Sequence, residues 1–344
     1  MAYSEVKQLF SPHMARVVSG IRSTGNLHLG NYFGAVKNFI KMQEENECFF
    51  FIADYHSLTT HPTPGNLKHT VRQVLIEYLA CGVDPQKCTI YIQSDLPSTA
   101  ELYLLLNMNA YVGELERSTT FKEKVRKQPD NVNAGLLTYP VLMAADILIH
   151  RASHVPVGKD QEQHLEMTRQ FGNRFNRLYN QEYFTEPVAY NFGEQLVKIP
   201  GLDGSGKMGK SEGEGNAVLL SDDETVIRKK VMKAVSDSGP TEPGQPKSEA
   251  VKNLFTLMEV VSSPETLQFF NDKYNECVIR YGDMKKQLAE DMVAFIKPLN
   301  ERIKEISSDE VYLKKVMNEG KEKATASAAK TINEVREIMG ISYR

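Results

Sequence analysis

The stretch Ser19–Ala35, SGIRSTGNLHLGNYFGA, joins a short buried strand expected at Arg16–Gly20 to a helix expected at Asn31–Asn46. Four glycines lie in it: Gly20, Gly25, Gly30 and Gly34. Glycine permits tight turns and lets a ligand approach the backbone closely. The start of the helix presents free N–H groups and a positive dipole end, and His28 and Asn31 add polar donors beside it. The stretch therefore predicts an anion site at a strand–helix turn.

Strands and helices alternate outward from this turn. Cys48–Asp54 (CFFFIAD) and Thr89–Gln93 (TIYIQ) are apolar runs typical of central parallel strands. Asn66–Ala80 and Ser98–Ala110 have apolar residues at helical spacing. This order predicts an α/β fold with a doubly wound parallel sheet, Rossmann-like, with ligands at the carboxyl ends of the strands.

The middle of the chain is less regular. Tyr111–Asn133 is polar and is interpreted as an insertion, and Leu136–His150 as a buried helix. A short strand is expected at Val155–Gly158, a helix at Gln161–Leu178 and a last strand at Val197–Ile199. The carboxylate of Asp146 lies within the apolar helix, where a buried acid needs a partner.

Beyond Gly215 the pattern is helical apart from a strand-like AVLL at Ala217–Leu220. Helices are expected at Asp222–Val235, Ser248–Val261, Pro264–Tyr281, Asp283–Ile306 and Asp309–Met339. The chain is therefore predicted to divide into a Rossmann-like domain, 1–212, and a helical domain, 213–344. A basic cluster, Arg228, Lys229, Lys230 and Lys233, is either a solvated helix face or a phosphate contact.

Composition narrows the class of protein. The 344 residues carry 41 Lys+Arg against 44 Asp+Glu, a net charge of −3, which argues against bulk adhesion to nucleic acid. The sequence shows neither a membrane-spanning apolar run nor a signal peptide, so a cytoplasmic protein without membrane contact is expected. The four cysteines have no paired spacing, which predicts reduced thiols and no protein-held metal. Tryptophan is absent.

A second glycine-rich stretch, Gly204–Ser211 (GSGKMGKS), fits the P-loop pattern of ATPases. A P-loop opens a helix at once, whereas EGEGNAVLL follows here, with two more glycines. The same letters contain KMGKS at Lys207–Ser211, whose two lysines suit a pyrophosphate leaving group.

Several motifs together carry a family resemblance. HLGN at His28–Asn31 resembles the HIGH signature of class I aminoacyl-tRNA synthetases, and KMGKS resembles their KMSKS signature. GELERSTTFKEK, GLLTYPVLMAADIL and VPVGKDQEQHLEMTR resemble bacterial-type tryptophanyl-tRNA synthetases more specifically. Departures from that pattern are Asn31, Gly209, Arg22 and Lys159.

The resemblance implies roles residue by residue. Catalytic roles fall to His28, Asn31, Lys207, Lys210 and Ser211. ATP would be bound by Arg22, Ser23, Thr24, Gly30, Asn31, Lys122, Gly158, Lys159, Asp160, Ile199, Lys207, Met208, Gly209, Lys210 and Ser211. Asp146 would accept the indole N–H of tryptophan, in a pocket lined by Tyr139, Met143, Val155, Val157 and Gln161.

The implied activity is that of a tryptophan–tRNA ligase. ATP, with Mg²⁺ carried by the nucleotide, would activate tryptophan as an adenylate, and tRNA(Trp) would then accept the amino acid. The resemblance also implies a homodimer formed by an insertion at about 108–150, and anticodon binding by the helical tail. The open alternatives are tyrosine specificity and, more distantly, a P-loop ATPase or a noncatalytic nucleotide-binding RNA module.

Overall fold

The structure, a computed structural model, describes residues 14–158, 161–190, 198–204, 206–209 and 215–343. Its centre is a parallel sheet of five strands in the order β3-β2-β1-β4-β5. The strands are β1 (Arg16–Arg22), β2 (Glu47–Ala53), β3 (Thr89–Ile92), β4 (His154–Val155) and β5 (Val188–Ala189). The chain winds outward on both sides of β1, so the predicted doubly wound α/β fold is confirmed.

Two apolar cores cover the two faces of this sheet. Alternate residues of β2 point to opposite sides, as the pleat requires: Phe50 and Ile52 belong to one core, and Phe49 and Phe51 to the other. The first core is shared with α2 (Lys37–Met42) and α4 (Pro64–Cys81). The second is shared with α5 (Pro97–Asn107), α8 (Ala134–Leu148) and α9 (Glu162–Leu178).

The helix after the first strand is less regular than expected. A short α1 (Leu29–Asn31) leads into a π-helical turn, Tyr32–Val36, before α2 continues. Such π turns occur mostly as single insertions within α-helices and often lie at functional sites. Further on, α4 ends at Gly82, whose left-handed φ of 105° suits glycine.

Two strand predictions in the middle of the chain need correction, and the predicted insertion gains detail. The insertion at 111–133 is helical, with α6 (Val112–Arg117) and α7 (Thr119–Lys127). The last strand among the described residues is β5; of the predicted strand 197–199, residue 197 lies outside the described residues, and residues 198 and 199 form no strand. Residues 217–220 form a single antiparallel bridge, from Leu219 to His28, instead of a strand.

The remaining helices are α10 (Glu224–Met232), α11 (Glu249–Val261), α12 (Pro264–Asn275), α13 (Tyr281–Ser308) and α14 (Glu310–Met339). The helix predicted to reach 281 ends at Asn275, because Cys277 adopts a left-handed φ of 59° that no helix continues through. A short four-residue helix, α3 (Asp54–Ser57), follows β2 directly.

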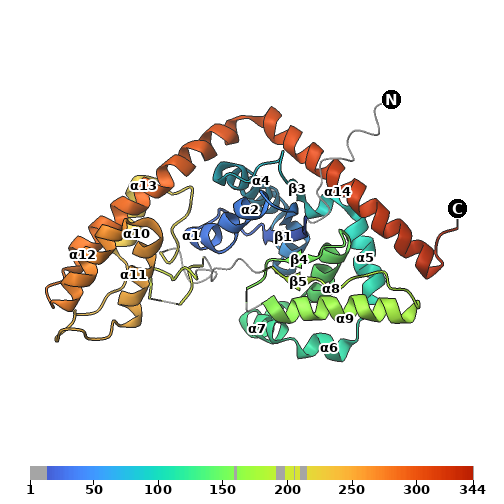
Figure 1. Cartoon of the computed structure of the whole chain (residues 1–344), viewed down its shortest axis with the longest axis horizontal. Coiled ribbons are helices and arrows are strands. Elements are labelled where there is room, and N and C mark those ends of the chain that lie inside the picture. The colour runs from blue at the N-terminus through green and yellow to red at the C-terminus, as the bar shows by residue number, and fades with distance from the viewer. Residues whose placement is uncertain (1–13, 159–160, 191–197, 205, 210–214, 344) are drawn as a thin grey trace.

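The helices of the C-terminal part stay attached to the sheet. Helix α13 packs against α10 and α4, while α14 crosses β3 and packs on α5, so the two long helices arch over the molecule (Figure 1). At the crossing, a Cβ on Gly320 would lie 1.7 Å from the carbonyl oxygen of Ile90, which only glycine avoids. Because α14 contributes to the second core together with the sheet, the division into two domains at residue 212 stays a prediction.

Two further expectations concern surfaces and thiols. None of the helices in the described ranges is both long and apolar enough to cross a membrane. The four cysteines are free, and burial raises the pKa of Cys48 and Cys81 to about 12, so these two thiols are inert core residues, as predicted.

Candidate functional site

A cavity of about 650 Å³ opens at the carboxyl ends of the strands. Its floor comes from β1 and β2, and its walls come from α7 and α8, the link after β4 and the start of α9. The residues with charged, imidazole or amide side chains that face it are Arg22, His56, Glu123, Lys124, Gln128, Asp146, Gln161, His164 and Lys207. The position is the one that an open parallel sheet offers a ligand.

Asp146 lies deep in this cavity, only 1% exposed, on helix α8. Its Oδ2 is 2.9 Å from Nε2 of His56, and the amide of Gln93 donates to both carboxylate oxygens, at 2.8 and 2.9 Å. Burial raises the pKa of Asp146, while the bonds from His56 and Gln93 oppose that rise. We call Asp146, His56 and Gln93 the Asp146 cluster.

The cluster fixes Asp146 as an acceptor with capacity to spare. A carboxylate has about four acceptor positions, and three contacts from His56 and Gln93 are accounted for. A donor group of a ligand in the cavity has one further position to occupy. Because the acceptor is buried, a ligand lacking that donor leaves the position unsatisfied at a cost.

Tyr139 and Lys124 form a second wall of the cavity. The hydroxyl of Tyr139 hydrogen-bonds Nε2 of His164, which fixes the ring. The ammonium of Lys124 lies 3.5 Å from the centre of that ring, a cation–π contact. Burial and the nearby charge of Arg22 lower the pKa of Lys124 to about 8.

Arg22, at the end of β1, adds a second cation to this wall. Its Nε and Nη2 are buried and have no hydrogen-bond partner among the residues that the structure describes. Burial lowers the pKa of its guanidinium, which nevertheless stays charged at neutral pH. Lys207 also faces the cavity. Arg22, Lys124 and Lys207, which we call the cationic wall, are suited to an anion.

The turn at His28–Asn31 is a closed cap. His28 Nδ1 accepts from the Asn31 N–H at 3.3 Å, and Asn31 Oδ1 accepts from the His28 N–H at 3.1 Å. The expectation that both side chains act as donors is thereby refined: Nε2 of His28 and the amide nitrogen of Asn31 are the atoms with donor character. A Cβ on Gly30 would lie 2.8 Å from His28 Nδ1, so the tight turn requires glycine.

The lysine stretch does not have P-loop geometry. Its described residues, 204 and 206–209, form neither strand nor helix, residues 198–203 before it form no strand, and residues 215–223 after it form no helix. A P-loop needs a preceding strand and a helix that starts at once. Instead, Met208 is 1% exposed, its N–H donates to the carbonyl of Ile199 at 2.8 Å, and it packs toward Gly30.

The predicted site residues divide into three groups. Those facing the cavity are Arg22, Tyr139, Met143, Asp146, Val155, Gln161 and Lys207. Those described elsewhere are Ser23, Thr24, His28, Gly30, Asn31, Lys122, Val157, Gly158, Ile199, Met208 and Gly209. Lys159, Asp160, Lys210 and Ser211 lie outside the described residues.

Two of these placements differ from the expected ones in an instructive way. Lys122 is exposed on α7, and Lys124, two residues on, faces the cavity instead. Val157 packs against the second core, and its neighbour Pro156 faces the cavity. Ser23, by contrast, is buried, and its hydroxyl hydrogen-bonds the hydroxyl of Ser57 at 3.0 Å.

Sequence reasoning missed His56, Gln93, Lys124 and His164. His56 lies three residues after the end of β2 and Gln93 directly follows β3, where a doubly wound sheet collects ligand-binding groups, so their position was an available signal. The signal for His164 was weaker: it lies in the first turn of α9, close to the predicted Gln161.

The arrangement has counterparts among known proteins. Residues 12–297 match the family model of tRNA synthetases class I (W and Y). The chain belongs to this family. Relatives include the tryptophan–tRNA ligase of Porphyromonas gingivalis, 63% identical over 95% of this chain and 99% of that protein. The tryptophan–tRNA ligase of Helicobacter pylori is 41% identical over 96% and 99%.

Solved structures agree with this class I assignment. Tryptophanyl-tRNA synthetase from Campylobacter jejuni, complexed with ADP and tryptophan, superposes with a TM-score of 0.82 at 34% identity, covering 94% of this chain and 99% of that one. A tyrosyl-tRNA synthetase from Aeropyrum pernix has a TM-score of 0.65 at 17% identity, which indicates a shared fold alone.

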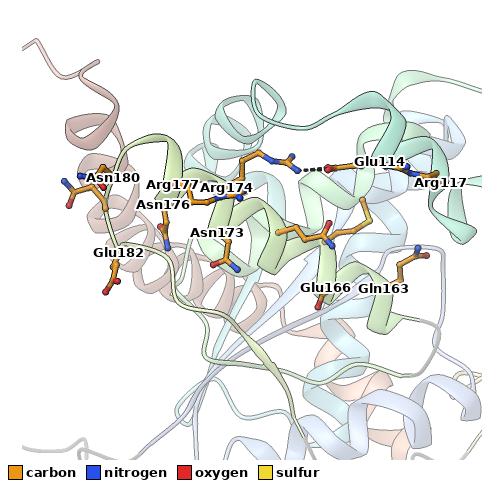
Figure 2. A pocket seen from close by; sticks show the side chains of 13 residues that line it. Glu114, Arg117, Gln163, Glu166, Asn173, Arg174, Asn176, Arg177, Asn180 and Glu182 are labelled. Atoms are coloured by element: carbon orange, nitrogen blue, oxygen red, sulfur yellow. Dashed lines mark hydrogen bonds and ion pairs between the residues drawn. The ribbon is translucent and has the colours of Figure 1, made fainter.

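A second hollow of this synthetase, about 1070 Å³, lies along the outer side of α9 and faces α6. Figure 2 shows its lining, in which acidic and basic side chains are mixed. Its buried charge, Arg174, is already paired with both carboxylate oxygens of Glu114, at 2.7 and 2.9 Å. This charge is thus satisfied within the protein, whereas the strand-end cavity holds the buried Asp146 and the cationic wall, and it is the candidate active site.

Proposed function

We propose that the protein attaches L-tryptophan to tRNA(Trp), using ATP and passing through a tryptophanyl-adenylate. The observation that carries this proposal is Asp146, buried in the cavity and held as an acceptor by His56 and Gln93. An indole N–H fits the remaining acceptor position. The sequence identity to tryptophan–tRNA ligases, 63% in one relative, supports the same choice.

The first step joins the tryptophan carboxylate to the α-phosphorus of ATP. A carboxylate oxygen forms the new bond, the bond to the bridging oxygen breaks, and pyrophosphate leaves with the electron pair. No protein nucleophile takes part, so catalysis consists of positioning and charge stabilisation. Arg22, Lys124 and Lys207 supply positive charge to the phosphates, and Mg²⁺ arrives with the nucleotide.

The other assigned roles complete this proposal. His28, Asn31 and Gly30 support the phosphate turn, with Ser23 and Thr24 beside it. Gly158, Lys159, Asp160 and the backbone near Ile199 hold the nucleoside. Lys210 and Ser211 bind the leaving pyrophosphate together with Lys207, with Met208 and Gly209 as the backbone between them.

The second step uses a ribose hydroxyl at the end of tRNA. That oxygen attacks the acyl carbon of the adenylate, and AMP leaves. We assign anticodon contacts to the helical part, 213–344, of which α10, α11 and α12 lie far from the sheet (Figure 1). In the basic cluster there, Arg228 pairs with Glu224 and Glu290, and Lys230 pairs with Asp222, which favours the solvated-face interpretation.

Amino-acid-dependent exchange between ATP and pyrophosphate tests the function. Tryptophan should support exchange and tyrosine should not. A phenol hydroxyl is the other donor that Asp146 would accept, so stimulation by tyrosine alone would establish the tyrosyl alternative. ATP hydrolysis that needs no amino acid would establish an ATPase.

The composition offers an independent binding assay. The chain contains no tryptophan, so bound tryptophan would be the only indole in the complex. Titration of micromolar protein should change tryptophan emission or anisotropy. An unchanged signal would contradict the assignment without reference to ATP or RNA.

A homodimer is part of the same proposal. Large apolar side chains are exposed where α5 ends and α6 begins: Leu104 (53%), Met108 (69%), Tyr111 (63%) and Val112 (59%). Exposed apolar side chains gathered in one short segment suit a second copy of the chain. Sedimentation should give twice the monomer mass for the protein and for Val278→Lys, an equally exposed control (53%) on the helical part, but the monomer mass for Val112→Lys. We assign the protein to the cytoplasm, where tRNA is charged.

A further inference from the structure

Asn216 is a buried polar residue, 1% exposed, just after the lysine stretch. Its side-chain amide donates to the carbonyl oxygens of Lys207, at 3.3 Å, and Gly209, at 3.2 Å. Its own carbonyl accepts from the Leu202 N–H at 3.1 Å. Asn216 thus hydrogen-bonds Leu202, which precedes the stretch, and the backbone on both sides of Met208.

The chain continues from Asn216 to the other phosphate motif. The carbonyl of Val218 accepts from the Leu29 N–H at 3.0 Å, and the Leu220 N–H donates to Leu27 at 2.9 Å. These bonds bracket His28 on both sides. Val218 and Leu220 are fully buried, so this short connection has little freedom to shift.

The two motifs also meet directly. Met208 lies between the two carbonyls that Asn216 holds, and its Cβ is 3.4 Å from where a Cβ of Gly30 would lie. The packing of Met208 on Gly30, the Met208 N–H bond to the carbonyl of Ile199 and the side chain of Asn216 therefore contribute to the position of Lys207 relative to the His28 turn. An amide is suited to that role because its nitrogen carries two hydrogens, one for each carbonyl.

We propose that Asn216 is a positioning residue for adenylate formation, which holds Lys207 in register with the His28–Asn31 turn. The inference rests on the proposed function and deepens it. During attack on the α-phosphorus, negative charge grows on the departing pyrophosphate, and a fixed cation stabilises it without reorganising. Small displacements of such a cation cost large factors in rate. Asn216 touches no substrate and acts through Lys207.

The test compares Asn216→Asp with a matched variant, Asn300→Asp. The carboxylate keeps the shape of the amide and removes both donated bonds. Asn300 is also buried, and its amide donates to two carbonyls, those of Leu220 and Asp222, both at 3.3 Å, but it does not touch the lysine stretch. The two variants thus lose equivalent bonds at different places.

Two rates separate positioning from general damage. In ATP–pyrophosphate exchange, Asn216→Asp should lower kcat on the order of 10- to 100-fold relative to Asn300→Asp, with the KM for tryptophan within about twofold. Transfer of tryptophan from preformed adenylate to tRNA should proceed at the unmodified rate, because pyrophosphate has already left. Tryptophan emission measures whether the pocket of each variant still binds.

Each outcome has a defined meaning. Equal exchange rates in the two variants, or equal slowing of exchange and transfer by Asn216→Asp, would overturn the inference. If Asn216→Asp fails to fold, Asn216→Ser keeps one donor without a new charge, and its exchange rate should be reduced while transfer is kept. Absence of tryptophan-dependent exchange in the unmodified protein would instead overturn the proposed function.

Discussion

The Asp146 cluster and the cationic wall line one cavity but differ in how far their polar groups are already paired within the protein. Asp146 is nearly inaccessible, and His56 and Gln93 occupy most of its acceptor capacity before any ligand arrives. In the cationic wall, Arg22 has two buried nitrogen atoms without a described partner, and Lys124 rests on an aromatic face. The protein leaves a single acceptor position open in the first region, whereas in the second it leaves two nitrogen atoms of Arg22 without a described partner.

The difference follows from what each region must recognise. A neutral N–H is weakly attractive, so it is selected only by an acceptor whose direction is already fixed. A triphosphate is strongly charged and supplies its own attraction, so cations with little internal compensation retain their strength for it. Selection of the amino acid thus belongs to the Asp146 cluster, and activation by ATP belongs to the cationic wall. Variants of the two regions should affect these two steps separately.

The largest effect is expected for Asp146→Ala. The variant removes the acceptor and leaves donors of His56 and Gln93 unpaired, so kcat/KM for tryptophan should fall by roughly 10³-fold or more. ATP binding, measured without amino acid, should change little. The measurement is ATP–pyrophosphate exchange over a range of tryptophan, beside direct nucleotide titration.

Asp146→Asn is the control for shape at this position. It keeps one carbonyl acceptor and the volume of the side chain, so it should lie between Ala and the unmodified protein. An unchanged affinity for tryptophan in Asp146→Ala, read from tryptophan emission, would refute the assignment of the indole.

Lys210→Ala should come next, with an effect on the order of 10²-fold. Its predicted role is to stabilise charge that develops on pyrophosphate, so exchange kcat should fall while ATP binding in the ground state is only modestly weakened. Pre-steady-state adenylate formation and ATP titration measure the two quantities. Equal losses in both would indicate a simple binding role instead.

Some elements of the fold could be predicted from the sequence and others could not. The sheet was predictable because CFFFIAD and TIYIQ are short apolar runs, rich in β-branched and aromatic residues, that are typical of buried strands. The edge strand β5 has two residues, of which Val188 is 44% exposed, so it leaves no apolar pattern to read. The helices α6 and α7 were hidden because their sequence is polar and short.

Asp146 itself was predictable as an acid within an apolar helix, but its partners were not. His56 is 90 residues and Gln93 is 53 residues away along the chain. Spacing carries no information about such contacts, which arise only when the strand ends converge. Lys122 and Lys124 differ by two positions on one helix, and the direction of α7 decides which of them faces the cavity.

Arg22→Gln tests whether the cationic wall carries uncompensated charge. Glutamine is polar and neutral, so the KM for ATP should rise about tenfold, an amount comparable to a lost charged hydrogen bond. Removing a buried charge should at the same time stabilise the unliganded protein by roughly 1 kcal/mol. Kinetics and thermal unfolding measure the two changes.

A matched variant makes the thermal result interpretable. Arg16→Gln removes an arginine of the same strand that already pairs with Glu47, at 2.8 Å, so it should lower Tm rather than raise it. If Arg22→Gln also lowers Tm, Arg22 has a stabilising partner in the unliganded protein, and the contrast between the two walls disappears.

The smallest expected effect is a pH dependence that belongs to Lys124. Its pKa is lowered to about 8 by burial and by Arg22, so the free protein loses this charge as pH rises from 7 to 9. ATP prefers the charged form, and the KM for ATP should therefore rise several-fold over that interval. The free energy of unfolding without ATP should change in the favourable direction, because burial of the charged amine costs stability. The unliganded protein should therefore become more stable as pH rises from about 8 toward the usual lysine value of 10.5. Lys124→Met should remove both dependences, and a KM that is flat in the unmodified protein would show that Lys124 does not meet the phosphates.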